Sequence, residues 1–503
     1  MIKKIFILFS IFGLLIIQSC KNNTLVKDQI TLNIGSEPQT LDPRKVRDIN
    51  SINIAKTLFD GLMRASKDGS VQCAIADRYV IDADGKQYTF FLKESFWSNG
   101  EKLTAYDFEY SYKKALSIDF VSPYAFNLFV IKNAKLAKAG KISSDEIGIK
   151  ALDEKTLVIQ LENPCPYFLN LLTMPIFFAV NKDIDQRNPN WFLDDKEFVS
   201  NGAFKLSRFK HSDYIEAKKN DLYWDAKIVK LKKIKMLMMT PDAELGMFEM
   251  NKLDIAGSPF STLTVDSLKK LKNDKNFCIL PFYGTSFIRV NTLKINDPHF
   301  RKALVNGFDR KKIIEHILQG GQKQSTKLVP TDETFDIPII KDDFASKTVT
   351  ISYISSDRAH ILAQALQRDL EDNLKIKVKL QALERKTFLD RLGSLDYELA
   401  LSSWIADFDD PIDFLNVFKY KDSSTNNTGW ENNKYTDLLE KSEITVDKCK
   451  RDKILVEAEN ILLNDAPIIP ICHLAQNLLK KESIKDLFIY PNGFIDFKYA
   501  YFE

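Results

Sequence analysis

The side chains that most often carry enzyme chemistry are scattered along this chain. The five histidines stand far apart, at His211, His299, His316, His360 and His473. Only Cys472 and His473 place two metal-capable residues together, and a metal site needs three or four converging ligands. We therefore predict no metal centre and interpret Cys472 and His473 as an ordinary pair in the protein core.

The sequence gives little support for acid/base catalysis either. Adjacent carboxylates such as Asp409 and Asp410 could transfer protons, but neighbouring acids are more often loop or capping residues. The local signatures of P-loop and dinucleotide-binding enzymes, zinc proteases and serine hydrolases are missing from the sequence. No cofactor is predicted. These observations favour a receptor over an enzyme.

Length and composition indicate a large globular protein. At the usual ~150 residues per domain, 503 residues suggest about three domains. Apolar residues make up 45% and charged residues 28%, which excludes fibrous, disordered and multi-span membrane classes. The 71 basic residues oppose 68 acidic ones, and the two signs are mixed along the chain, so we expect no nucleic-acid partner.

The first twenty residues are typical of an export signal. Lys3 and Lys4 precede an apolar or weakly polar run over 5–17, which as a helix of roughly 20 Å is too short to span a ~30 Å bilayer core. The segment 17–20 resembles a bacterial lipoprotein cleavage box, although Gln18 departs from the usual small residue. We predict a lipoprotein signal peptide at 1–20, lipidation at Cys20 and a tether at 21–27, with plain secretion as the alternative.

Five cysteines follow Cys20, an odd number, so at least one thiol stays free. Their wide spacing does not indicate a disulfide scaffold, and we expect mostly buried small hydrophobic residues. The sequence leaves open whether any of them pair. They are Cys73, Cys165, Cys278, Cys449 and Cys472.

Strand and helix patterns alternate along the chain. Residues 30–34 alternate as a strand does, 78–93 predicts a hairpin, and Thr104 with Asp107 predicts a capped helix start. Further on, helices are expected over 298–306 and 309–318. Residues 348–380 read as strand, helix, strand, which implies parallel pairing with a right-handed crossover. An α/β architecture follows for the C-terminal half.

Six blocks in order resemble the bacterial periplasmic oligopeptide-binding proteins, the receptors of ABC peptide importers in solute-binding protein family 5. They span nearly all the mature chain. The blocks are GSEPQTLDP at 35–43, FDGL at 59–62, FWSNGEKLTAYDF at 96–108, NGAF at 201–204, NDLYWD at 220–225 and WIADFDDP at 404–411.

The resemblance implies the type II (cluster C) periplasmic binding protein fold, with two α/β lobes that close about a hinge. An extra domain packs on the first lobe. By this pattern lobe I takes 28–59, 184–285 and 486–503, the extra domain takes 60–183, and lobe II takes 286–485. The strand–helix–strand unit falls in lobe II, as expected.

Members of the family hold an extended peptide through its main chain, as an added strand. Each net hydrogen bond contributes only about 0.5–1.5 kcal/mol, so several must act together. The matching positions here are Ser403, Trp404, Ile405 and Asp407. The resemblance implies that Asp407 pairs with the ligand's α-ammonium. The alternative is that Asp407 caps a turn ahead of Pro411 and Trp404 lies in the core.

The resemblance implies further contacts outside the 403–407 segment. The resemblance implies a second strand-like contact at Arg47, Asp48 and Ile49, for which an exposed loop is the alternative, and a cleft tyrosine at Tyr124. This chain also departs from relatives. It has Leu401 where some carry arginine, Arg385 where they carry tryptophan, and Gly284 and Ile405 where some have a disulfide. Ligand length and side-chain preference therefore cannot be inherited.

Extra positive charge is expected in the cleft. Arg385 lies where a ligand carboxylate could bind, as do Arg358 and His360 near the start of a helix over 358–374. A helix N-terminus adds about half a positive charge. We expect a preference for short or acidic peptides, including cell-wall-derived ones. The alternative is a solvated helix end.

The sequence thus predicts a monomeric receptor, lipid-anchored at the periplasmic face of a bacterial membrane. It would close on short peptides and deliver them to a permease pair driven by two ATPases, without chemistry of its own. A family receptor for a dipeptide, murein tripeptide, nickel chelate or haem remains an alternative. A secreted hydrolase is the alternative from another class.

Overall fold

The structure, a computed structural model, describes residues 27–503 except 337 and 341. The predicted signal peptide, Cys20 and residues 21–26 of the tether lie outside the described residues. Within the part of the chain that is described, no helix is both long enough and apolar enough to cross a membrane.

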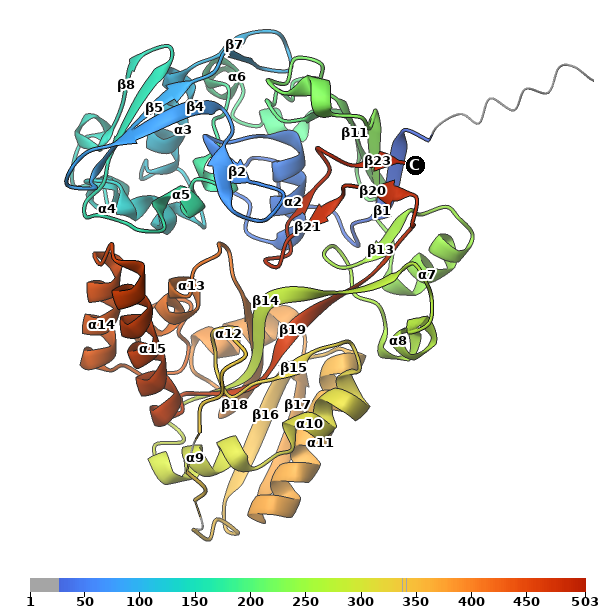
Figure 1. Ribbon diagram of the computed structural model, residues 1–503. Coiled ribbons are helices and arrows are strands. Elements are labelled where there is room, and N and C mark those ends of the chain that lie inside the picture. Colours follow the sequence, from blue (N-terminus) through green and yellow to red (C-terminus); the bar gives the residue numbers. More distant parts are fainter. Residues whose placement is uncertain (1–26, 337, 341) are drawn as a thin grey trace, which may run out of the picture.

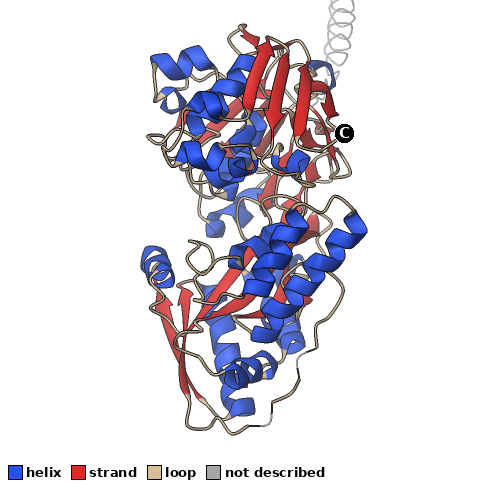
Figure 2. Ribbon diagram, turned by 90° about the vertical axis from the view of Figure 1, so that its left-hand side faces the viewer, coloured by secondary structure: helices blue, strands red, loops and turns tan. Residues whose placement is uncertain are grey.

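Two long strands join the two halves of the molecule (Figures 1 and 2). They are β14 (Phe277–Val290) and β19 (Ile468–Lys480), which pair antiparallel along most of their length. Both belong to one sheet with the order β10-β11-β12-β1-β13-β19-β14-β18-β16-β17, in which β15 (Lys323–Gln324) also pairs with β19. This sheet, shared between two α/β halves, confirms the predicted two-lobed fold class.

The first lobe is built on β1, which pairs in parallel with β12 and β13. The predicted strand is confirmed, because Ile30 and Leu32 are buried in alternation with less buried neighbours. The lobe's strands are β1 (Gln29–Asn33), β10 (Phe204–Lys210), β11 (Tyr214–Lys219), β12 (Lys233–Leu237) and β13 (Ile255–Gly257). Its helices include α2 (Ile49–Leu58), α7 (Pro241–Glu249) and α8 (Val265–Leu271). Short strands of the C-terminal tail are β20 (Ile484–Lys485), β21 (Phe488–Ile489), β22 (Ile495–Asp496) and β23 (Tyr501–Phe502).

The extra domain has its own antiparallel sheet with the order β4-β5-β9-β8. The predicted hairpin is confirmed as β4 (Ala76–Ile81) and β5 (Gln87–Leu92), and Gly85 takes a positive φ of 67° in its turn. The remaining strands are β8 (Ile149–Asp153) and β9 (Thr156–Gln160). Helix α3 (Ala105–Ala115) begins as predicted, with the Thr104 N–H donating to Asp107 Oδ2 at 2.8 Å.

Short elements complete this half of the molecule. The pairs β2 (Met63–Ala65) with β3 (Val71–Cys73) and β6 (Ser95–Phe96) with β7 (Lys102–Leu103) form two-stranded sheets. Three short helices are α4 (Ala134–Lys138), α5 (Phe168–Leu171) and α6 (Lys182–Arg187). Figure 1 labels β2, β7, α4, α5 and α6 of this group, all in the half opposite the second lobe.

The second lobe contains the predicted parallel unit. Strands β16 (Thr348–Ile354) and β17 (Lys377–Leu383) pair in parallel, and α11 (Asp357–Leu374) connects them. Strand β18 (Leu399–Ile405) pairs in parallel with β16 and antiparallel with β14. Helices α9 (Pro298–Asn306) and α12 (Arg385–Gly393) complete the lobe. The helix expected over 309–318 is α10 (Arg310–Lys312) continued by π-helical turns to Leu318.

A group of helices from the second lobe also contacts the extra domain. These helices are α13 (Ile412–Leu415), α14 (Asn433–Glu443) and α15 (Lys448–Asp465). Just before α13, the ring of Phe408 stacks on that of Tyr167 with centroids 5.4 Å apart. The Asn170 side-chain amide donates to the Asp409 carbonyl at 2.9 Å. The two halves therefore touch on the side where the 404–411 block lies.

All five described cysteines are free thiols. Cys165 and Cys472 are buried, Cys73 and Cys278 are partly buried, and Cys449 is exposed. The expectation that these cysteines are buried is therefore confirmed for Cys165 and Cys472 and is wrong for Cys449. Because none of the five is bonded to another, packing rather than disulfides stabilises the described part of the chain.

Candidate functional site

A cavity of about 660 Å³ lies where β16 and β18 end, beside the two long strands. Residues of β14 and β19 line one side of it, and the first turns of α11 and α12 line another. This position fits the rule that ligands of α/β proteins bind beyond the carboxyl ends of the strands. A neighbouring cavity of about 400 Å³ shares Phe282, Leu474 and Ala475 with it. Each of the two has the volume of a small-molecule site.

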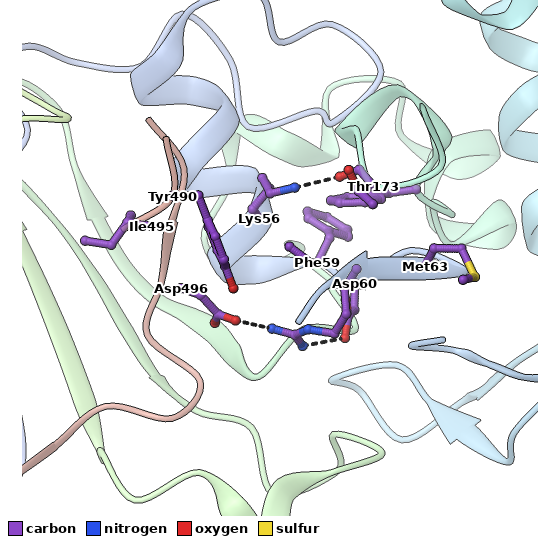
Figure 3. A pocket seen from close by; sticks show the side chains of 11 residues that line it. Lys56, Phe59, Asp60, Met63, Thr173, Tyr490, Ile495 and Asp496 are labelled. Atoms are coloured by element: carbon purple, nitrogen blue, oxygen red, sulfur yellow. Dashed lines mark hydrogen bonds and ion pairs between the residues drawn. The ribbon is translucent and has the colours of Figure 1, made fainter. Parts of the chain in front are cut away.

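A third cavity, shown in Figure 3, differs in character. Its volume is only about 30 Å³, little more than one water needs. The charges around it are paired within the protein. The Arg64 guanidinium contacts Asp60 at 3.0 Å and Asp496 at 2.6 Å, and Lys56 donates to the Thr173 carbonyl at 2.6 Å. We interpret this cavity as part of the packing between α2 and the C-terminal tail, not as a ligand site.

Asp407 follows β18 and faces the extra domain. Its Oδ1 accepts a hydrogen bond from the Tyr124 hydroxyl at 3.1 Å. Burial raises the pKa of Asp407 to about 6, and the hydrogen bond from Tyr124 opposes that rise. Within the described residues no cation pairs with this carboxylate. The structure thus brings two sequence-predicted site residues together around an acid that lacks a counter-ion.

Asp413 is a site residue that the sequence analysis missed. Its Oδ2 accepts hydrogen bonds from the Trp404 indole N–H at 2.9 Å and from the Asp407 backbone N–H at 3.1 Å. Burial, and then the charge of Asp407, raise the pKa of Asp413 well above the usual value. One signal was available, since Asp413 is the only charged residue in the apolar run Ile412–Leu415.

The strand residues before Asp407 line the larger cavity. Ser403 and Trp404 are among its walls, and Ile405 pairs with Gly284 of β14. The register of β18 with β14 extends to Ile405, whereas its register with β16 covers only Leu399 and Ala400. Residues 401–405 therefore have one strand edge without a strand partner. An extended ligand could pair with that edge.

Arg47, Asp48 and Ile49 lie at the start of α2 and not in a strand. Asp48 is the N-cap, and its carboxylate accepts from the Ser51 N–H at 3.0 Å. The Arg47 guanidinium donates to the Gln39 side chain at 3.1 Å. None of the three lines either large cavity. A peptide contact by these residues stays a prediction.

Two of the three predicted cationic residues line the larger cavity. Arg358 and Arg385 belong to its walls, at the N-terminal ends of α11 and α12. His360 is exposed and its Nδ1 forms a hydrogen bond of 2.6 Å with the Tyr353 hydroxyl. Sequence reasoning missed a further cation, Arg289 of β14, which also lines the cavity. The sequence did offer one indication, because Arg289 is the only charged residue in the apolar run 287–290 at the end of β14.

The residues first considered for catalysis have structural partners. His473 is buried, with Nδ1 2.9 Å from Thr285 Oγ1 and Nε2 accepting from the Thr331 N–H at 3.4 Å. Burial lowers its pKa to about 4. Asp410 forms two hydrogen bonds with Arg451, at 2.7 and 2.8 Å. Among the described residues no three His, Cys, Asp or Glu side chains gather as a metal site would need.

Comparison with known proteins identifies the family. The model of the bacterial extracellular solute-binding proteins, family 5 (middle), matches residues 70–346 and 334–426. The chain is 34% identical to the oligopeptide-binding protein OppA of Bacillus subtilis, covering 96% of this chain and 94% of that protein.

Two solved structures share the fold over nearly the whole chain. The OppA of Haemophilus influenzae in complex with RPPGFSPFR is 26% identical with a TM-score of 0.81, covering 95% of this chain and 99% of that one. The murein tripeptide binding protein MppA of Escherichia coli is 26% identical with a TM-score of 0.82, covering 95% and 98%. The two-lobed architecture is thus that of a known fold, and the chain belongs to the family 5 extracellular solute-binding proteins.

Proposed function

We propose that this protein is the extracytoplasmic receptor of an ABC importer and that it binds oligopeptides between its lobes. The observation that carries the proposal is Asp407, a partly buried carboxylate with no cationic partner among the described residues. It follows directly on a strand whose residues 401–405 have a free edge. Relatives include oligopeptide-binding receptors, one of them solved with RPPGFSPFR.

The free strand edge and the Asp407 carboxylate would recognise different parts of a peptide, its backbone and its α-ammonium group. The free edge of β18 offers backbone N–H and C=O groups that any peptide can pair with, so side-chain selectivity need not be high. Asp407 fixes the register by forming a charge-assisted hydrogen bond with the ligand's α-ammonium. Ser403, Trp404 and Ile405 would contact the first ligand residues, and Tyr124 would keep the carboxylate oriented.

Closure of the lobes would complete the site. The long strands β14 and β19 form the connection about which the halves could rotate. Arg47, Asp48 and Ile49 would approach the ligand from the first lobe in the closed state. Arg358, Arg385 and His360 are candidates for the end of the ligand that carries its carboxylate. The lobe limit predicted between residues 285 and 286 lies within β14, whereas the limit predicted between 485 and 486 lies beyond the end of β19.

The cellular setting follows from the same proposal. Cys20 would carry a lipid anchor, and residues 21–27 would tether the receptor to the periplasmic face of the membrane. The receptor would act as a monomer and deliver its cargo to a permease pair driven by two ATPases. It would perform no chemistry. One alternative is a receptor of the same family and fold for a dipeptide, murein tripeptide, nickel chelate or haem. The alternative from another class is a secreted hydrolase, which would cut its ligand.

Substitution Asp407→Asn tests the proposal. Loss of the buried ion pair costs roughly 3–5 kcal/mol, so peptide affinity measured by titration calorimetry should fall by more than about a hundredfold. The fold, checked by circular dichroism and thermal melting, should persist. Mass spectrometry of the peptides after incubation should return every ligand uncut. Unchanged affinity would refute the amine anchor, and cut peptides would favour the hydrolase.

A further inference from the structure

We propose that the 660 Å³ cavity is a carboxylate subsite that selects peptides with an acidic side chain in addition to their C-terminal carboxylate. This inference rests on the proposed peptide-binding function and names the ligand chemistry. Its basis is an imbalance of charge in the cavity wall, described next.

Three arginines line the cavity, and no aspartate or glutamate does. Arg289 comes from β14, Arg358 from α11 and Arg385 from α12. The nearest acid along the chain from Arg385 is Glu384, whose carboxylate accepts two backbone N–H groups of its own helix, at 2.7 and 3.2 Å. The wall therefore carries three formal positive charges that no lining carboxylate balances.

Arg289 is the most buried of the three, with 4% of its surface exposed. Its guanidinium donates to the carbonyl of Asn426 and lies 5.3 Å from the ring centroids of Phe287 and Phe418. Its Nε has no hydrogen-bond partner. Burial lowers its pKa to about 10. A buried guanidinium with an unused donor is costly, and an anion in the cavity would reduce that cost.

Two other buried arginines in this fold have acids as partners, whereas a third, Arg301, donates to the backbone carbonyls of Ile295, Asn296 and Asp465. Arg44 contacts Asp42 at 2.9 Å and Asp185 at 2.6 Å, and Arg451 contacts Asp410 at 2.7 Å. The three cavity arginines differ from these, since none has an ion pair within the described chain. A ligand carboxylate in the cavity would supply the counter-charge that the three arginines lack.

The helices that carry Arg358 and Arg385 add to the positive potential. Ser356, the N-cap of α11, and Ala359 in its first turn both line the cavity. The α12 residues Arg385 and Phe388 do the same from the first turn of that helix. Two helix N-termini thus face the space that the arginines line, and both favour anions. A ligand's C-terminal carboxylate supplies one negative charge, so a second carboxylate is favoured and an extra ammonium disfavoured.

Titration calorimetry with matched peptides tests the inference. Alanine peptides of three to six residues serve as the base series, and each alanine in turn is replaced by Glu, Gln or Lys. At one or more positions the Glu peptide should bind at least about tenfold tighter than the Gln peptide, the gain of one charge-assisted hydrogen bond. The Lys peptide should bind more weakly than the Gln peptide at the same position.

Variants then locate the subsite. Arg358→Gln and Arg385→Gln, singly and together, remove charges that have no ion pair in the described chain, so the fold should survive. The preference for Glu over Gln should fall by about tenfold or vanish. Arg289→Met should reduce it further, with folding checked by circular dichroism. Arg368→Gln is the matched control, because Arg368 lies on the same helix as Arg358, is exposed and does not line the cavity.

The outcomes separate this inference from the function on which it rests. Equal affinity for Glu and Gln peptides at every position, with the alanine peptides bound, would overturn the inference and leave the receptor function standing. A preference for Glu that survives in the double variant would also overturn it, because the cavity arginines would then not be its source. Failure of every peptide to bind would overturn the proposed function and the inference with it.

Discussion

Asp413 accepts a hydrogen bond from the backbone N–H of Asp407 at 3.1 Å, which places a buried carboxylate beside a partly buried one. Burial and the charge of Asp407 raise the pKa of Asp413 well above its usual value, while burial raises that of Asp407 to about 6. An ionised Asp407 therefore favours the protonated form of Asp413. In that form Asp413 positions the Trp404 indole and the loop that carries the anchor.

A protonated Asp413 leads to different expectations for two substitutions. Asp413→Asn keeps an acceptor for Trp404 and for the Asp407 N–H, so peptide affinity should stay close to that of the wild type. Asp413→Ala leaves both donors unsatisfied, and affinity should fall by about 1–3 kcal/mol. Titration calorimetry on both variants decides this. Equal losses in the two would mean that the charge of Asp413 is needed.

Peptide affinity should depend on pH at both ends of the neutral range. It should rise as pH increases through about 6, where Asp407 loses its proton. It should fall again above roughly pH 8, where the free α-amine of a peptide becomes neutral. The wild type titrated between pH 5 and 9 should show this maximum. If peptide affinity still rises near pH 6 in Asp407→Asn, another titrating group is responsible for the rise.

The same carboxylate should affect the stability of the ligand-free protein. Its pKa is higher in the folded chain than in the unfolded one, so the folded state binds the proton more tightly. The stability this contributes is full below about pH 4 and is lost as pH rises through about 6. Urea unfolding should therefore show Asp407→Asn gaining stability relative to the wild type between pH 4 and pH 7. A relative loss over that interval would contradict the buried carboxylate.

Asp410 should contribute to the stability of the fold through its ion pair with Arg451. Its bidentate contact with Arg451 is almost fully buried, at 2.7 and 2.8 Å, and Arg451→Met would leave the carboxylate without its partner. The free energy of unfolding should fall by about 3–5 kcal/mol, measured by urea titration. Lys448→Gln, which removes an exposed charge on the same helix, serves as the control. A loss below 1 kcal/mol for Arg451→Met would show that the pair contributes little.

Local patterns predicted the elements well. Three elements were predicted because the residues that determine them are close in the sequence. They are the cap formed by Thr104 and Asp107, the helix after Asp297 and the parallel unit over 348–380. The π-helical turns before Gln319 were not predicted, since nothing local distinguishes them from an α-helix.

The site was harder to predict because its contacts join distant segments. Tyr124 and Asp407 are 283 residues apart, and only the family resemblance brought them together before the structure did. Asp413 and Arg289 were missed, although each is a lone charge in an apolar run. Such a residue must be paired or functional, but the sequence does not show which segment faces it. Arg47 to Ile49 lie at the start of a helix because Asp48 is a good cap, and their contact with a ligand stays a prediction.

The most direct measurement compares a peptide with its N-acetylated form on the wild type and on Asp407→Asn. In titration calorimetry at pH 7, acetylation should weaken binding to the wild type by more than about a hundredfold, the cost of an ion pair. It should have little effect on the variant, because the amine then has no carboxylate to meet. If the acetylated peptide binds the wild type as tightly as the free one, Asp407 does not anchor an amine.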